Sequence, residues 1–156
     1  MILYLDTSAL IKLYAEEPGT DQVRDAVGSA RIAAVSEIGY VEARSALARR
    51  ERENSFSPEE HDKIVEKLER DFQEIFLLRR VTGEVIAQAG ALVRRHALRA
   101  YDAVHLATAL ELREEALELP QDLQEPAEGL QVRLMSYDSS LHEAAQGEEL
   151  AYTGSE

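Results

Sequence analysis

MILYLDTSAL (residues 1–10) is the most informative stretch of this sequence. Its first five residues are apolar or aromatic and show no polar alternation, which is typical of a strand covered on both faces in a parallel sheet. Asp6 follows this strand directly, and Thr7 and Ser8 come next. Ligands of open α/β sheets bind beyond the carboxyl ends of the strands, so Asp6 lies where a functional site is expected.

Asp6 also has a purely structural interpretation. Asp, Thr and Ser side chains accept hydrogen bonds from the first turn of a helix, and the following residues, SALIKLYAEE (8–17), have a helical pattern. Taken alone, Asp6 is explained more simply as a helix cap than as a catalytic group. The rest of the sequence must therefore decide between the two interpretations.

Strand and helix patterns alternate along the remaining chain. Strands are expected at RIAAVS (31–36), FLLRRV (76–81), LQVRLMSYD (130–138) and ELAY (149–152). Helices are expected at TDQVRDAV (20–27), at 37–52, after the caps Ser57 and Thr82, at YDAVHLATALELR (101–113) and at SSLHEAAQ (139–146). This alternation predicts an α/β fold with a central, mainly parallel sheet flanked by helices.

Length and composition narrow the class of protein. A chain of 156 residues suits one domain, so we expect a single domain over residues 1–156. The absence of cysteine excludes disulfides and thiolate metal sites. No apolar run approaches the ~20 residues of a membrane span, and the N-terminus lacks the basic flank of a signal peptide. We therefore expect a cytoplasmic protein without membrane contact.

The net charge of −13 is unevenly distributed. Residues 111–156 hold 12 acids and 2 Lys or Arg, whereas residues 1–110 hold 18 acids and 15 Lys or Arg. The segment 114–129 is acidic and contains two prolines, which predicts a surface loop or insertion. An acidic surface repels nucleic acid, so RNA contact would depend on local arginines, and the candidates are Arg44, Arg49 and Arg50.

Three acids stand out by their positions. Asp6 and Asp138 both end predicted strands and both precede predicted helices. Glu42 lies in the middle of an apolar helix, and none of the residues three or four positions away is a cation. A local ion pair therefore does not explain Glu42.

Asp102 opens an Ala-rich helix and is the fourth candidate. Arg99 or His105 could neutralise it, which makes a structural role as plausible as a functional one for Asp102 alone. We expect His105 to pack or hydrogen-bond beneath the site rather than to bind a metal. No aromatic platform for stacking RNA bases is evident from the sequence.

The four acids together favour a metal site. If they converge at the strand ends, they cannot all ionise unless a cation is present. Mg²⁺ or Mn²⁺ takes a few carboxylates and leaves positions for water and phosphate oxygens. The chemistry indicated is metal-assisted hydrolysis of a phosphodiester.

Four segments resemble a known family in their order and spacing. They are MILYLDTSALIKLY (1–14), SEIGYVEARSALAR (36–49), LRAYDAVHLATAL (98–110) and MSYDSSLHEAA (135–145). Together they resemble PIN-domain ribonucleases, and they look like the VapC toxins of type II toxin–antitoxin pairs. The resemblance implies a PIN-like three-layer fold and a Mg²⁺-dependent endoribonuclease that cleaves RNA.

The same resemblance implies roles for particular residues and partners. It gives catalytic and metal-binding roles to Asp6, Glu42, Asp102 and Asp138, and supporting roles to the hydroxyls of Ser8 and Ser136. It further implies a VapB-type antitoxin as partner and a homodimer. The alternatives are a housekeeping PIN nuclease in RNA processing and a non-enzymatic Mg²⁺-binding phosphoacceptor domain; the latter would not require Glu42.

Overall fold

A parallel sheet with β1 (Ile2–Leu5) at its centre organises the computed structural model, which describes residues 1–119 and 130–154. The other strands in this part of the chain are β2 (Ile32–Ser36), β3 (Leu77–Arg79), β4 (Val132–Met135) and β5 (Ala151–Thr153). Their order is β3-β2-β1-β4-β5, and every neighbouring pair runs parallel. The sequence predicted a mainly parallel sheet, which is confirmed.

Strand β1 is buried on both faces, as its apolar composition predicted. Ile2 and Tyr4 pack into one hydrophobic cluster, and Leu3 and Leu5 pack into the other. The two clusters lie on opposite faces because successive side chains of a strand point to opposite sides. A strand without polar alternation is therefore stable only where helices cover both faces.

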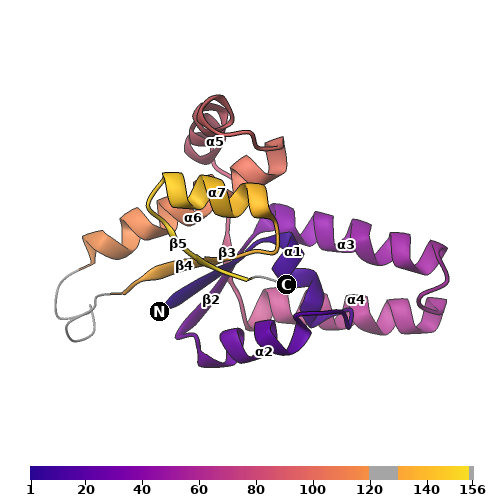
Figure 1. Ribbon diagram of the computed structural model, residues 1–156. Coiled ribbons are helices and arrows are strands. Elements are labelled where there is room, and N and C mark those ends of the chain that lie inside the picture. The colour runs from indigo at the N-terminus through magenta and orange to yellow at the C-terminus, as the bar shows by residue number, and fades with distance from the viewer. Residues whose placement is uncertain (120–129, 155–156) are drawn as a thin grey trace.

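Helices cover each face of the sheet (Figure 1). One face carries α5 (Gly83–Arg95), α6 (Ala100–Glu118) and α7 (Ser139–Gly147). The other carries α1 (Thr7–Leu10), the 3-10 turn η1 (Ile11–Leu13), α2 (Thr20–Ser29), α3 (Glu37–Arg52) and α4 (Pro58–Glu74). Figure 1 shows α3 and α4 projecting together beyond the sheet as an arm. The predicted three-layer α/β arrangement is confirmed.

The strand register brings distant residues to one edge of the sheet. Leu5 of β1 pairs with Val35 of β2 on one side and with Met135 of β4 on the other. Asp6 and Ser136, which follow these strand ends, therefore emerge side by side although 130 residues separate them. The register alone thus places the ends of β1 and β4 where a shared site can form.

Helix caps follow the sequence signals closely. Ser57 accepts a hydrogen bond from the backbone of Glu60, and the Glu60 side chain bonds back, which forms the predicted capping box ahead of α4. The Thr82 hydroxyl accepts a hydrogen bond from Val85 N at the start of α5. Local chemistry therefore sets where these helices begin.

The helices after β1 and after Asp102 differ from the sequence prediction. The helical pattern of residues 8–17 is realised only as α1 and the short turn η1. Conversely, the predicted acidic loop 114–129 is wrong for residues 114–118, which continue α6. Glu, Ala and Leu are good helix formers, and the helix ends only before Pro120, whose ring disfavours helical backbone at Leu119. Residues 120–129 lie outside the described residues.

None of the helices in residues 1–119 and 130–154 combines the length and apolar character that crossing a bilayer requires.

Gly154 provides a test of how tightly β5 packs beside β4. Its φ is +103°, and a Cβ there would lie 2.0 Å from the carbonyl oxygen of Ser136. We expect Gly154→Ala to lower the free energy of unfolding by at least about 1–2 kcal/mol, because the left-handed backbone alone costs that much for alanine. Urea denaturation measures the loss.

Gly28→Ala is the matched control for this substitution. Gly28 lies within α2, and a Cβ there would meet no atom within 4 Å. Alanine should stabilise this helix by roughly 0.5–1 kcal/mol relative to glycine. Equal effects of the two substitutions would contradict the close packing described at Gly154.

Candidate functional site

The four acids singled out in the sequence line one small cavity beyond the carboxyl ends of β1 and β4. Its volume is about 190 Å³. Its lining consists of Asp6, Thr7, Ser8, Glu42, Arg99, Asp102, His105 and Asp138. Four separate parts of the chain contribute: the junction of β1 and α1, the middle of α3, the beginning of α6, and the start of α7. The structure therefore brings all four acids together.

Asp6 is the most deeply placed of these acids, with only 4% of its surface exposed. Its Oδ1 accepts hydrogen bonds from Ser8 Oγ at 2.7 Å and from Ala9 N at 2.9 Å. Its Oδ2 accepts one from Ser136 Oγ at 2.6 Å. Asp6 is thus the N-cap of α1 and also lines the cavity, and its catalytic role stays a prediction.

Ser8 and Ser136 are oriented by the backbone that follows β4. Tyr137 N donates to Ser8 Oγ at 2.8 Å, and Asp138 N donates to Ser136 Oγ at 3.0 Å. Because each hydroxyl already accepts a backbone proton, its own proton is directed to Asp6. The supporting contacts that the family resemblance implied for these two serines are present.

Burial raises the pKa of Asp6 above its ordinary value of 3.8. Neighbouring His105 and the hydrogen bonds from Ser136, Ala9 and Ser8 act in the opposite direction without cancelling the effect. The groups that hydrogen-bond the carboxylate are two hydroxyls and one amide, with no cation among the described residues. A bound cation would therefore favour the ionised form of Asp6.

Arg99 joins the other two aspartates. Its Nε donates to Asp102 Oδ2 at 2.8 Å, and its Nη2 lies 3.3 Å from Asp138 Oδ2. The Arg99 side chain is 79% exposed, whereas those of Asp102 and Asp138 are 13% and 28% exposed. Asp138 also caps α7 by accepting a hydrogen bond from Leu141 N at 3.0 Å. The sequence suggested Arg99 as a partner of Asp102 but gave no sign of its contact with Asp138.

Glu42 is held by a chain of hydrogen bonds that begins in the core. Tyr4 Oη lies 2.8 Å from His105 Nδ1, and His105 Nε2 lies 2.7 Å from Glu42 Oε1. Thr7 Oγ1 donates to the same oxygen of Glu42 at 2.8 Å. Burial raises the pKa of Tyr4, so its hydroxyl keeps a proton to donate to Nδ1. We accordingly assign the other proton to Nε2, which donates to Glu42.

The hydrogen bonds from His105 and Thr7 favour the ionised form of Glu42. Burial opposes its ionisation, but the hydrogen bonds of His105 and Thr7 outweigh burial and hold the pKa of Glu42 below its ordinary value. His105, only 2% exposed, packs beneath the site as expected, although it faces Glu42 rather than Asp102. Tyr4 could not be identified from the sequence, because a tyrosine in an apolar strand is indistinguishable from an ordinary core residue.

The side chains that line the cavity are of the types that bind a hard divalent cation, but the positions of these described residues do not form a metal site. Carboxylate and hydroxyl oxygens dominate the lining, which are the ligands that Mg²⁺ and Mn²⁺ prefer. Within residues 1–119 and 130–154, no three acidic or histidine side chains stand in an arrangement that could hold a metal. The guanidinium of Arg99 lies between Asp102 and Asp138. A cation there would require this exposed side chain to move.

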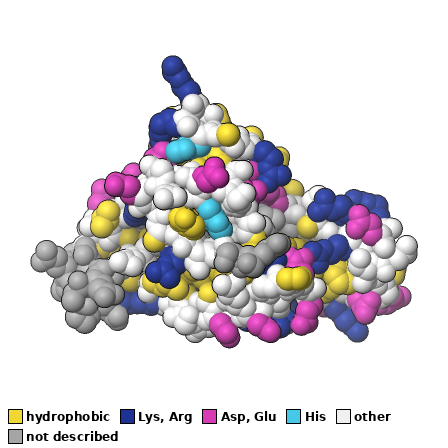
Figure 2. All heavy atoms as spheres, viewed as in Figure 1, with side chains coloured by type: hydrophobic (Ala, Val, Ile, Leu, Met, Phe, Trp, Pro, Cys, Tyr) yellow, Lys and Arg dark blue, Asp and Glu magenta, His cyan; other side chains and the backbone are white. Residues whose placement is uncertain are grey.

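The three arginines predicted to contact RNA differ in their surroundings. Arg44 pairs with Glu69 at 3.2 Å, and Arg50 pairs with Glu17. Arg49 is exposed and has no ion-pair partner among the described residues. In Figure 2, Lys and Arg side chains gather over α3 on the projecting arm. RNA contact by these arginines stays a prediction. Of the three, Arg49 is the one that forms no ion pair with an acid in the described part of the chain.

Comparison with known proteins finds one matching family and relatives that share a name. The sequence matches the PIN domain family over residues 3–145. Ribonuclease VapC45 and Ribonuclease VapC49, both from Mycobacterium tuberculosis, are each 36% identical to it over 112 residues, which cover 70% of this chain and 75% of the relative.

Solved structures share the fold at low sequence identity. FitAcB from Neisseria gonorrhoeae matches with a TM-score of 0.68 and 18% identity over 99% of this chain and 97% of that one. A toxin–antitoxin complex from Klebsiella pneumoniae has a TM-score of 0.57 and 18% identity over 88% and 87%. VapC20 from M. tuberculosis, described as a sarcin-ricin loop cleaving toxin, has a TM-score of 0.63 and 15% identity over 91% and 94%.

The core hydrogen bond of Tyr4 can be tested by removing one oxygen. Tyr4→Phe leaves His105 Nδ1 buried without its partner, which should lower the free energy of unfolding by about 1–3 kcal/mol. Tyr152→Phe, at a tyrosine that is 40% exposed, should change it by less than about 0.5 kcal/mol. Chemical denaturation of both variants provides the comparison, and a stable Tyr4→Phe protein would argue against the assigned chain.

The raised pKa of Asp6 predicts a pH-dependent effect of Asp6→Asn in chelator. The folded state holds the Asp6 proton to higher pH than the unfolded state, so this group costs stability as pH rises above its ordinary pKa of 3.8. Asparagine keeps the cap and carries no charge. We therefore expect the variant to unfold at a higher temperature than the parent at pH 7, with the gap closing toward pH 4. A gap independent of pH would contradict the burial argument.

Proposed function

Because the chain belongs to the PIN domain family, as its four segments predicted, we propose that it is a metal-dependent endoribonuclease that uses Mg²⁺ or Mn²⁺. The observation that carries the proposal is the convergence of four carboxylates on one cavity, including buried Asp6 with no cation hydrogen-bonded to it. The ribonuclease names of the relatives support the same substrate class.

In this proposal Asp6, Glu42, Asp102 and Asp138 would hold the cation at the carboxyl edge of the sheet. When bound, the ion would neutralise charge on the phosphate and lower the pKa of a water molecule beside it. Ser8 and Ser136 keep both oxygens of Asp6 in fixed directions, and His105 does the same for Glu42. These hydrogen bonds fix the directions of the carboxylate oxygens that would bind the cation.

Arg99 has a different part in the proposed site. With Asp102 and Asp138 as partners it neutralises charge that would otherwise accumulate in the cavity. Its side chain is 79% exposed, so it can leave these carboxylates at little cost and turn to an RNA phosphate. Arginine suits this exchange because its planar guanidinium matches carboxylate and phosphate alike.

The proposal extends to a toxin of a toxin–antitoxin pair, with a VapB-type antitoxin as partner and a homodimer as the assembly. Similarity to relatives named VapC and to a solved toxin–antitoxin complex supports the antitoxin. A housekeeping PIN nuclease would use the same site, and a neighbouring gene for a short DNA-binding protein distinguishes the two. The phosphoacceptor alternative does not account for Glu42, which lines the same cavity as Asp6.

Removing one charge at a time tests the proposed chemistry. We expect Asp6→Asn and Asp102→Asn each to lower Mg²⁺-dependent RNA cleavage at least about a hundredfold, since loss of a group that merely orients a metal ligand already costs roughly 10–100-fold. Sequencing of 5′ ends after incubation of total bacterial RNA measures cleavage. The melting temperature of the parent should rise in millimolar Mg²⁺ and that of the two variants should not.

Asp62→Asn is the control for charge alone, because its side chain is 80% exposed and lies outside the cavity. It should cleave RNA and respond to Mg²⁺ as the parent does. Full cleavage by either site variant, or a parent melting temperature indifferent to Mg²⁺, would refute the metal site.

A further inference from the structure

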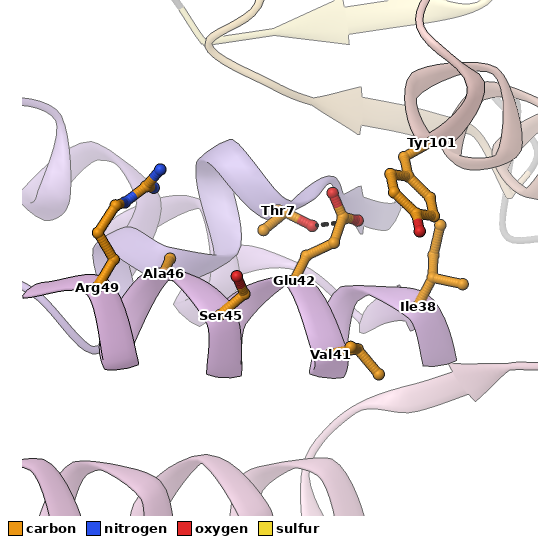
Figure 3. A pocket seen from close by; sticks show the side chains of 8 residues that line it. All are labelled: Thr7, Ile38, Val41, Glu42, Ser45, Ala46, Arg49 and Tyr101. Carbon is orange, nitrogen blue, oxygen red and sulfur yellow. Dashed lines mark hydrogen bonds between the residues drawn. The ribbon is translucent and has the colours of Figure 1, made fainter.

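A second cavity opens directly beside the carboxylate site, and Thr7 and Glu42 line both (Figure 3). Its volume is about 510 Å³, which lies within the roughly 300–1,000 Å³ typical of ligand sites. Figure 3 shows Glu42 between Tyr101 on one side and Arg49 on the other. The cavity is thus a groove along α3 that passes the proposed reaction centre.

One end of the groove is apolar and aromatic although it faces solvent. Val41 is 66% exposed and Tyr101 is 61% exposed, and Ile38 lies between them and the core. No aromatic platform was evident from the sequence, and of the described residues Tyr101 is the one aromatic side chain that lines this groove. Tyr101 precedes Asp102 at the start of α6, and its ring points toward the groove.

The other end of the groove carries an available positive charge. Arg49 lies seven residues beyond Glu42, which is two helical turns or about 10 Å along α3. The nearby Arg44 and Arg50 are paired with glutamates, whereas Arg49 has no such partner among the described residues. An anion in the groove would therefore meet Arg49 without displacing an acid.

We propose that this groove binds single-stranded RNA on both sides of the bond to be cut, with a base stacked on Tyr101 and a phosphate held by Arg49. This inference rests on the proposed nuclease function and adds the position of the substrate. An aromatic face accepts any base, and stacking needs an unpaired one, so the groove selects single-stranded segments. The alternation of apolar, carboxylate and cationic groups along the groove fits a nucleotide chain better than an apolar protein helix.

Binding of two matched RNAs separates stacking from charge. One is a randomised ten-nucleotide RNA, and the other is an abasic ten-mer with the same backbone; fluorescence anisotropy gives both affinities in Ca²⁺, with intact RNA verified on a gel. Tyr101→Ala should weaken binding of the base-bearing RNA roughly 5- to 100-fold and leave the abasic one unchanged. Tyr101→Phe, which keeps the ring, should bind both as the parent does.

Arg49→Ala should behave differently from Tyr101→Ala. It should weaken binding of both RNAs and lower the slope of log affinity against log salt by about 0.7, the value for one phosphate contact on a single strand. Tyr152→Ala and Arg94→Ala, at exposed residues away from the groove, should change neither affinity. Circular dichroism and melting temperature verify that all variants fold.

The remaining outcomes show which proposal is wrong. If the parent binds neither RNA, both the proposed nuclease function and the proposed RNA groove are wrong. If the parent binds RNA and Tyr101→Ala binds both RNAs equally well, the groove proposal is wrong while the function stands. If Tyr101→Ala changes the sedimenting mass of the protein but not its affinity for RNA, the groove is a protein-docking surface and the proposal is wrong.

Discussion

A buried carboxylate that must be fully hydrogen-bonded determines how the two ends of this chain meet. Asp6 is nearly inaccessible, so its oxygens need partners from within the protein, and Ser136 supplies one of them from 130 residues away. That bond is possible only because β1 and β4 are adjacent and end in register. The hydrogen bonds of Asp6 therefore link the pairing of β1 with β4, the cap of α1 and the candidate site.

The site divides its charges into two kinds. Asp6 and Glu42 are held by groups that come from the core and the strand ends, whereas Asp102 and Asp138 share an exposed arginine. The first pair is fixed by packing. The second is held by a surface ion pair, which is worth little, and by the hydrogen bond from Leu141 N to Asp138. A cation can thus enter on the exposed side while the inner carboxylates keep their orientation.

The sequence was sufficient to predict most elements and to place Asp6 and Asp138 at one edge of the sheet. A doubly buried first strand implies a parallel sheet, and parallel strands share a carboxyl edge. Glu42 and Asp102 lie within helices, so their positions depend on how α3 and α6 pack against that edge. The sequence was not sufficient for contacts such as Tyr4 with His105, because these depend on packing between residues 101 apart. The exposure of Tyr101 could not be predicted either, since an apolar helix pattern does not show which turn leaves the core.

The arm formed by α3 and α4 extends away from the sheet, but Glu42 is anchored to the central strand through His105 and Tyr4. The far half of α3 is anchored as well, because Leu47 is fully buried in a hydrophobic cluster of the core and Arg50 pairs with Glu17. Arg49 therefore stands at a set distance along the helix from Glu42. Any chain that lies along α3 meets this cation and this carboxylate at one fixed spacing.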